Sequence, residues 1–146
     1  MITGVEVDFV VKDSLAALEL YESIFDVERI EVTSFQRGHN EVIFSIYGTR
    51  FHMLDENEKF QLIAPKADAL QSVWFNVVVP DIGASHDKAI KAGCTEIQAV
   101  TEIPDFGVSN SIFTDSFGYM WMLHQIRREV SFEERLNMFE EDPGLQ

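Results

Sequence analysis

The sequence contains little cysteine, little proline and no long apolar run. Among its 146 residues are a single cysteine, Cys94, and four prolines. One cysteine excludes an intramolecular disulfide and suits a reducing compartment, and a lone thiol is more often a packing residue than a reactive one. Residues 1–4 carry no basic segment of the signal-peptide type, and no stretch reaches membrane-spanning length. We therefore expect a cytoplasmic protein that does not insert into membranes.

Positive charge is also scarce. Eleven Lys and Arg residues stand against 25 Asp and Glu residues, which gives a formal net charge of −14. Nucleic acids and anionic membrane surfaces are both bound by clustered basic residues, so the composition argues against either partner. The acidic residues are most simply a solvated surface, but a cleft lined with them would attract cations.

The apolar residues are numerous enough to form the core of one ordinary globular domain over residues 1–146. Hydrophobic residues make up 46% of the chain, and twelve Phe, three Tyr and two Trp form a large aromatic share. Aromatic side chains bury much area each, and they also line ligand pockets.

The order of predicted elements repeats. The first half predicts a strand, a helix after the Asp13–Ser14 cap, and three further strands, over residues 4–12, 14–25, 29–35, 41–47 and 50–55. The second half predicts the same order over residues 72–79, 82–92, 95–103, 108–114 and 119–126. A final helix opens at Ser131, where Glu134 completes a capping-box pattern.

Two offsets indicate an internal duplication. Asp13 and Asp81, which follow the first strand of each half, are 68 residues apart (81 − 13), and the turn glycines Gly48 and Gly118 are 70 apart (118 − 48). We therefore predict an α+β fold of two βαβββ modules, residues 3–56 and 72–127. A connector over residues 57–71 joins them, and a helical tail over residues 128–146 follows.

Strand alternation separates a pocket face from a helix-covered face, because successive strand residues point to opposite sides. The mixed polar and aromatic faces, which we expect to line a pocket between the halves, hold Glu6, Asp8, His52 and Leu54, and Trp74, Asn76, Met122 and His124. The apolar faces, which we expect the helices to cover, hold Val5, Val7, Phe9, Val11, Phe51 and Met53, and Val73, Phe75, Val77 and Val79. The alternative is that the polar faces are simply solvated, with His124 an ordinary histidine.

The run Thr114-Asp-Ser-Phe-Gly-Tyr-Met-Trp121 resembles the D-P-F-G-x-x-W signature of the PhnB-like branch of the vicinal oxygen chelate (VOC) superfamily, which includes glyoxalases, bleomycin-resistance proteins and dioxygenases. Ser116 replaces the usual proline, and Phe106-Gly107 upstream also fits. With the two modules and the paired aspartates, the resemblance covers about residues 3 to 127. It implies a homodimer and, in the enzymes, a divalent metal ion held by the first and last strands of each half.

Carried onto this chain, the resemblance implies the metal ligands Glu6 and His52 in the first half. The same count in the second half reaches Trp74 and Met122, which are not ligands for a hard divalent ion. We therefore expect no complete metal site, with a divalent metal ion as the alternative; Asp8 or His124 would add a third ligand only in an altered geometry.

Three interpretations follow, and the sequence does not decide whether the chain is an enzyme. The first is a dimeric, metal-free protein of the glyoxalase/bleomycin-resistance type that binds a cationic or aromatic small molecule. The second is a metal-dependent lyase, isomerase or dioxygenase that uses Glu6 and His52. The third is a dimeric interaction module whose tail helix, over residues 132–139, docks a partner.

Overall fold

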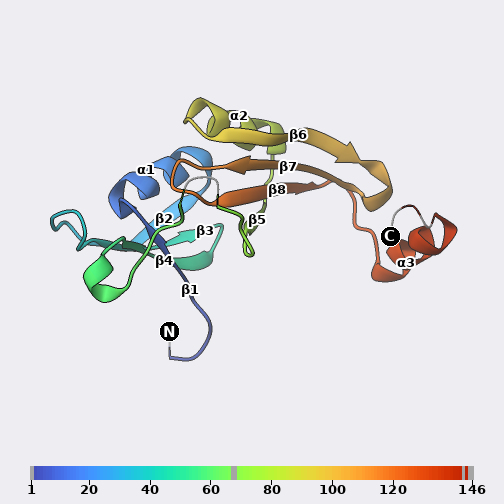
Figure 1. Cartoon of the computed structure of the whole chain (residues 1–146). Coiled ribbons are helices and arrows are strands. Elements are labelled where there is room, and N and C mark those ends of the chain that lie inside the picture. Colours follow the sequence, from blue (N-terminus) through green and yellow to red (C-terminus); the bar gives the residue numbers. More distant parts are fainter. Residues whose placement is uncertain (1, 67–68, 143, 145–146) are drawn as a thin grey trace.

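The computed structural model describes residues 2–66, 69–142 and 144, and it has two four-stranded sheets, each with one helix packed against it (Figure 1). The first half consists of β1 (Val7–Val11), α1 (Ser14–Ile24), β2 (Val27–Val32), β3 (Glu41–Ile46) and β4 (Thr49–Asp55). The second half consists of β5 (Phe75–Val78), α2 (Ile82–Lys91), β6 (Thr95–Ile103), β7 (Val108–Thr114) and β8 (Met120–Ile126). Short 3-10 helices, η1 (Glu58–Phe60) and η2 (Pro104–Phe106), and the terminal α3 (Phe132–Glu141) complete the described elements.

The two sheets have the same topology. Their strand orders are β1-β4-β3-β2 and β5-β8-β7-β6, and in each sheet the first strand runs parallel to the last while the other pairs are antiparallel. The predicted α+β fold of two βαβββ modules with a C-terminal helix is therefore confirmed.

The first strand of each half is shorter than predicted. Strand pairing begins at Val7 and at Phe75, so Val5 and Val73 lie outside the sheets and are 90% and 70% exposed. The prediction that Val5 and Val73 face the helices is wrong, because without a paired neighbour strand nothing holds this part of the chain against the helix layer. Val7, at the first paired position, is also partly exposed.

Hydrogen bonds repeat at equivalent places in the two halves. The Ser14 N–H, at the start of α1, donates to Asp55 Oδ1 at the end of β4 (2.7 Å). At the positions 68 and 70 residues later (82 − 14 and 125 − 55), the Ile82 N–H donates to Gln125 Oε1 (3.0 Å). Each last strand therefore anchors the start of its own helix, as the duplication predicts.

The helix-covered faces of both sheets share one core. The Phe75 ring lies 5.2 Å from Phe9 and 4.7 Å from Trp121, and Tyr21 lies 5.0 Å from Trp121, between ring centroids. Cys94 is buried in the same core, as expected for a packing residue, and burial raises the pKa of its thiol to about 12. Because rings from both halves interlock, neither half can lose its packing without exposing the other.

Asp115 explains the sequence run that carries the family resemblance. Its Oδ2 accepts hydrogen bonds from Tyr21 Oη (2.6 Å) and Trp121 Nε1 (2.8 Å), and its Oδ1 accepts from the backbone N–H groups of Phe117 (2.9 Å) and Tyr119 (3.0 Å). One buried carboxylate thus fixes the turn before β8, the indole on β8 and the helix of the other half. In this chain Asp115, which opens the run, therefore has a structural role.

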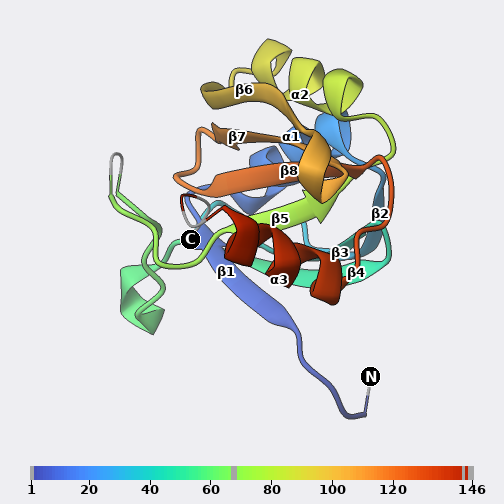
Figure 2. The ribbon, with the colours of Figure 1, turned by 90° about the vertical axis from the view of Figure 1, so that its right-hand side faces the viewer.

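The terminal helix α3 lies apart from α1 and α2, beyond the end of the second sheet (Figures 1 and 2). The predicted cap is confirmed in its Ser131 part, because Ser131 Oγ accepts from the Glu134 N–H (3.1 Å). Within α3 no side chain is fully buried, although the Phe139 ring lies 6.0 Å from Phe106. No helix in the described ranges is long and apolar enough to cross a membrane.

Candidate functional site

The predicted pocket residues separate into two groups on two different sheets. Glu6, Asp8 and His52 gather on the first sheet, and Asn76 and His124 lie together on the second. We predicted a pocket lined by both halves. The groove that contains Asn76 and His124 is instead lined by residues of the second half and of the tail.

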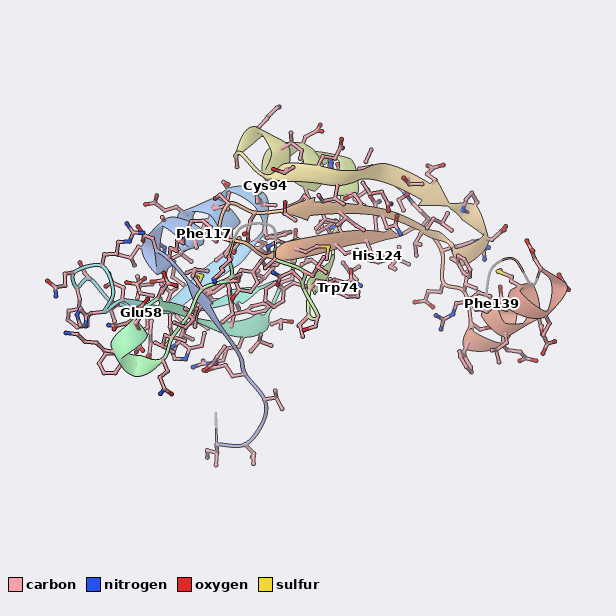
Figure 3. The ribbon with its side chains drawn as sticks, viewed as in Figure 1. Glu58, Trp74, Cys94, Phe117, His124 and Phe139 are labelled. Carbon is pink, nitrogen blue, oxygen red and sulfur yellow. The ribbon has the colours of Figure 1, made fainter. Side chains whose placement is uncertain are left out.

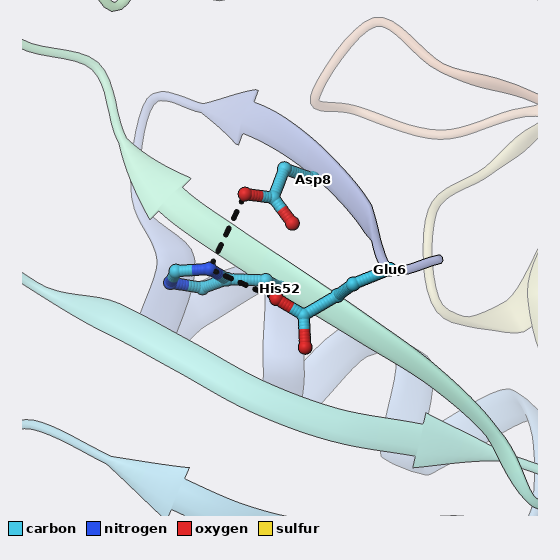
Figure 4. Close-up of side chains that lie close together, drawn as sticks. All are labelled: Glu6, Asp8 and His52. Carbon is cyan, nitrogen blue, oxygen red and sulfur yellow. Dashed lines mark ion pairs between the residues drawn. The ribbon is translucent and has the colours of Figure 1, made fainter. Parts of the chain in front are cut away.

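The first group is an acidic cluster, which we define as Glu6, Asp8, Glu41 and His52. Figure 4 shows Glu6, Asp8 and His52. Asp8 on β1 is paired in register with His52 on β4, so both side chains point to the same side of the sheet. His52 Nδ1 lies 3.4 Å from Glu6 Oε1 and 3.4 Å from Asp8 Oδ2. One potential ligand atom from each of these three residues lies within 4.8 Å of the others.

The other ring nitrogen of His52 faces Glu41. Its Nε2 atom is buried and has no hydrogen-bond partner among the described residues, and it lies 3.4 Å from Glu41 Oε2. Three carboxylates therefore surround one imidazole, and none of the three distances is short enough for a well-formed hydrogen bond.

Arg50 supplies the positive charge of the cluster. Its Nε donates a hydrogen bond to Glu6 Oε2, and this bond lowers the pKa of Glu6 against the opposing effect of burial, with the charges of Arg50 and His52 adding to the lowering. Glu6 is therefore ionised at neutral pH. Its second oxygen, Oε1, faces His52.

The cluster fits a divalent metal ion of the kind that the family resemblance implies. Two donor atoms that each lie about 2.1 Å from a tetrahedral ion are about 3.4 Å apart, the separation between His52 Nδ1 and each of the two carboxylate oxygens. Imidazole and carboxylate ligands suit zinc, manganese, iron and nickel. Asp8 on β1, two residues after Glu6, is thus a third donor that the two-per-half ligand pattern does not contain.

The equivalent positions of the second half hold no donors. Trp74 precedes β5 and is half exposed, and Met122 is paired in register with Asn76. Leu54, the remaining predicted residue of the first half, is paired with Val10 and is partly buried. Within the part of the chain that the structure describes, Glu6, Asp8 and His52 are the group of acidic and histidine side chains close enough together to hold one ion.

The second group lies in a groove of about 1030 Å³ between the second sheet and α3. His124 Nδ1 lies 2.6 Å from Asn76 Oδ1, and burial lowers the pKa of His124. Figure 3 labels His124 on β8 and Phe139 on α3, with α3 beyond the end of the sheet. The apolar side chains of α3, predicted only as a stripe that docks a partner, also line this groove.

Comparisons with known proteins find the fold and no close relative. No family model matches the sequence, and no curated protein matches it either. Among solved structures, a variant of the fosfomycin resistance protein FosX from Listeria monocytogenes, complexed with Mn(II) and 1S,2S-dihydroxypropylphosphonic acid, aligns over 95% of this chain and 99% of its own with a TM-score of 0.65 and 18% identity.

The chain has the vicinal oxygen chelate fold. FosX from Mesorhizobium loti aligns over 94% of this chain and 99% of its own (TM-score 0.64, 18% identity), and a PhnB protein from Bacillus cereus over 84% and 99% (TM-score 0.61, 15% identity). The resemblance drawn from the sequence is thus confirmed for the VOC fold. Identities this low carry the fold and no activity.

Proposed function

We propose that Glu6, Asp8 and His52 bind a divalent transition-metal ion, and that the chain is a metal-dependent small-molecule-binding protein of the VOC type. The observation that carries this proposal is the position of His52 Nδ1, 3.4 Å from one oxygen of each carboxylate. Three protein ligands leave coordination positions for a small molecule, and a bound ion would polarise the oxygens of that molecule as a Lewis acid. Manganese in a FosX neighbour supports the choice of ion class.

The surrounding residues would prepare the three ligands. Arg50 keeps Glu6 ionised and holds its Oε2, so that Oε1 is turned toward His52. Glu41 lies on the Nε2 side of the imidazole, where a carboxylate favours a proton on Nε2 and leaves the Nδ1 lone pair for an ion. The proposal differs from the expectation of an incomplete site because Asp8 Oδ2 lies as close to His52 Nδ1 as Glu6 Oε1 does, 3.4 Å.

A second candidate is metal-free binding of an organic cation on the same cluster. The ion pair of Arg50 with Glu6 favours this candidate, because it already occupies part of the carboxylate that a metal ion would use. Neither candidate includes a reaction, and the homodimer predicted from the resemblance stays a prediction to be checked by sedimentation.

Calorimetric titration tests the two candidates directly. Mn²⁺ or Zn²⁺ added to chelator-treated protein should bind at one site per chain, and Asp8→Asn should weaken that binding by at least about tenfold because a charged ligand is lost. His39→Ala removes an exposed histidine elsewhere and should change nothing. No metal binding to the unaltered chain, together with Asp8-dependent binding of benzyltrimethylammonium, would replace the metal proposal by the second candidate.

A further inference from the structure

The residues before β1 form an N-terminal arm, which we define as residues 2–6. Strand pairing in the first sheet starts at Val7, and residues 2–5 make no hydrogen bond to another described residue. The side chains of Ile2 and Val5 are almost fully exposed, so apolar burial does not hold the arm either. Figure 1 shows this part of the chain leading away from the sheet. The arm therefore has no attachment to the fold before Glu6.

Within the described residues, Glu6 is the member of the arm that side chains of the first sheet contact. Arg50 Nε donates a hydrogen bond to Glu6 Oε2, and Glu6 Oε1 lies 3.4 Å from His52 Nδ1. A hollow beside the arm is lined by residues 2–4 together with Glu6 and Arg50, which places Arg50 next to the arm. Figure 4 shows Glu6 reaching toward His52 from the start of β1. One carboxylate therefore determines where the arm leaves the sheet.

We infer that ion binding fixes the N-terminal arm, an inference that rests on the metal site proposed above. An ion held by Glu6 Oε1 joins the arm to Asp8 on β1 and to His52 on β4, two residues that strand pairing already holds in place. Because Glu6 Oε2 stays with Arg50, the ion adds a second attachment and does not replace the first. A ligand that binds one conformation of the arm better than the others shifts the arm toward that conformation. The order of the arm thus depends on the occupancy of the site.

The second half of the chain contains the same kind of segment without a ligand. Trp74 stands 68 residues after Glu6 (74 − 6), and strand pairing in the second sheet starts one residue after Trp74. Val73, the counterpart of Val5, is also exposed. An indole offers no donor that suits a hard divalent ion. Ion binding therefore changes the order of the arm and leaves that of residues 71–73 unaltered.

Arg50 determines how much order the arm keeps without an ion. In Arg50→Met the ion-free arm loses its one hydrogen-bonded attachment, and an ion restores order because Glu6, Asp8 and His52 are all still present. In Glu6→Ala both attachments are lost together. The two variants therefore separate a metal-dependent attachment of the arm from a merely structural effect of Arg50.

Nuclear magnetic resonance relaxation of ¹⁵N-labelled protein measures the order of the arm directly. On addition of Zn²⁺ to the chelator-treated chain, the amide order parameters of Gly4 and Val5 should rise from the flexible range, below about 0.6, toward the rigid value of about 0.85. Those of residues 71–73 should not change. In Arg50→Met the arm should start lower and reach the same value with Zn²⁺, and in Glu6→Ala it should stay low throughout.

The imidazole signals of His52 report ion binding independently of the arm. If they shift with Zn²⁺ while the order parameters of Gly4 and Val5 do not change, the coupling is refuted and the metal proposal stands. No shift of His52 refutes the metal proposal and the coupling together. An arm that is as rigid as β1 before Zn²⁺ is added also refutes the coupling. These three outcomes need only the unaltered chain, so they hold even if Arg50→Met or Glu6→Ala fails to fold.

Discussion

At the scale of single residues, the two halves differ in how strongly each last strand holds its helix. Asp55 accepts from three backbone N–H groups, those of Ser14 (2.7 Å), Gly38 (2.9 Å) and Asn40 (3.0 Å), and it is buried. Its counterpart Gln125 accepts one such bond, from Ile82. A charged acceptor with three donors is worth more than a neutral one with a single donor, because leaving buried donors unpaired is costly.

We therefore predict that Asp55→Ala lowers the free energy of unfolding by about 3 kcal/mol, and Gln125→Ala by about 1 kcal/mol. Urea denaturation of the two variants measures this difference, and equal losses would contradict it.

Burial raises the pKa of Asp55, but the N–H bonds outweigh it and the net pKa is lowered from its ordinary 3.8. The contribution of Asp55 is thus complete above that value and is lost as the pH falls through the lower folded value. Asp55→Ala should flatten acid unfolding in that range.

Cys94 provides a second test at this scale. Its buried thiol has a pKa of about 12, first because burial disfavours the thiolate and then because of the nearby Asp115 charge. We predict that iodoacetamide at pH 8 modifies the folded chain far more slowly than the urea-unfolded chain, since only the thiolate reacts. Mass spectrometry of the alkylated protein follows this reaction. Equal rates in both states would show that Cys94 is accessible and not part of the core.

At the scale of elements, Gly107 connects η2 and β7 to the chain that leads into α3. Its carbonyl accepts from the N–H groups of Arg127 (2.7 Å) and Arg128 (3.1 Å). Its φ is +67°, and a Cβ placed there would lie 2.5 Å from the Arg128 carbonyl oxygen. Gly48 also has a positive φ, +85°, but a Cβ there would meet nothing within 4 Å.

The two glycines form a matched pair. Gly48→Ala should lower the free energy of unfolding by about 1 kcal/mol, because a residue with a Cβ is strained in the left-handed conformation. Gly107→Ala should lower the free energy of unfolding by about 2–4 kcal/mol, because the backbone of Arg128 must move as well. Thermal unfolding of the two variants measures the difference. Equal costs at both positions would mean that the close approach to Arg128 is unimportant.

The helices and strands were the features best predicted from the sequence. The Asp13 cap was predicted because an aspartate before a helical apolar pattern commonly caps a helix. The structure gives Asp81 the same role in the second half, and each side chain accepts from the N–H of the third residue on, Ala16 and Ala84 (3.1 Å each). The starts of β1 and β5 were misjudged, because β-branched residues such as Val5 continue the alternation although the neighbouring strand pairs only from Val7 onward. The alternation of apolar and polar residues predicts an extended segment, but it does not predict the residue at which strand pairing begins.

At the scale of the whole molecule, the halves are joined by more than the connector. Besides the shared aromatic core, the Tyr21 hydroxyl donates to Asp115, and the Tyr119 hydroxyl donates to the Val10 carbonyl (2.8 Å), each across the boundary between the halves. We predict one cooperative unfolding transition in differential scanning calorimetry. Two separate transitions would show that the halves are independently stable.

Tyr21→Phe should lower the free energy of unfolding by about 1–3 kcal/mol, because Asp115 loses one of its donors. Burial, followed by the Asp115 charge, raises the pKa of Tyr21 well above its ordinary 10.0. A raised folded pKa means that the contribution is present below pH 10 and is lost as the pH rises toward the folded value. Alkaline unfolding of the unaltered chain should therefore be steeper than that of Tyr21→Phe, as followed by circular dichroism, and identical profiles would contradict this role.

The site was only partly predictable at this largest scale. Alternation put Asp8 and His52 on one face, and these two residues are paired in register on neighbouring strands, with Glu6 just before β1 close to both. It could not show that Asn76 and His124 lie in a separate groove, since that depends on how the two sheets are packed together and on where α3 lies. The tail helix has no periodic relation to either sheet, so the strand pattern does not predict that α3 and β8 line the same groove.

The most direct test of the central claim, that Glu6, Asp8 and His52 bind a divalent metal ion, is the metal content of the purified chain. Protein purified without chelator, supplied with manganese or zinc and then dialysed, is measured by elemental mass spectrometry beside His52→Ala and the exposed-histidine control His39→Ala. We predict about one ion per chain in the unaltered protein and in His39→Ala, and almost none in His52→Ala, because the imidazole is the only nitrogen ligand of the cluster. No ion in any of the three proteins, or the same content in all of them, would contradict the claim.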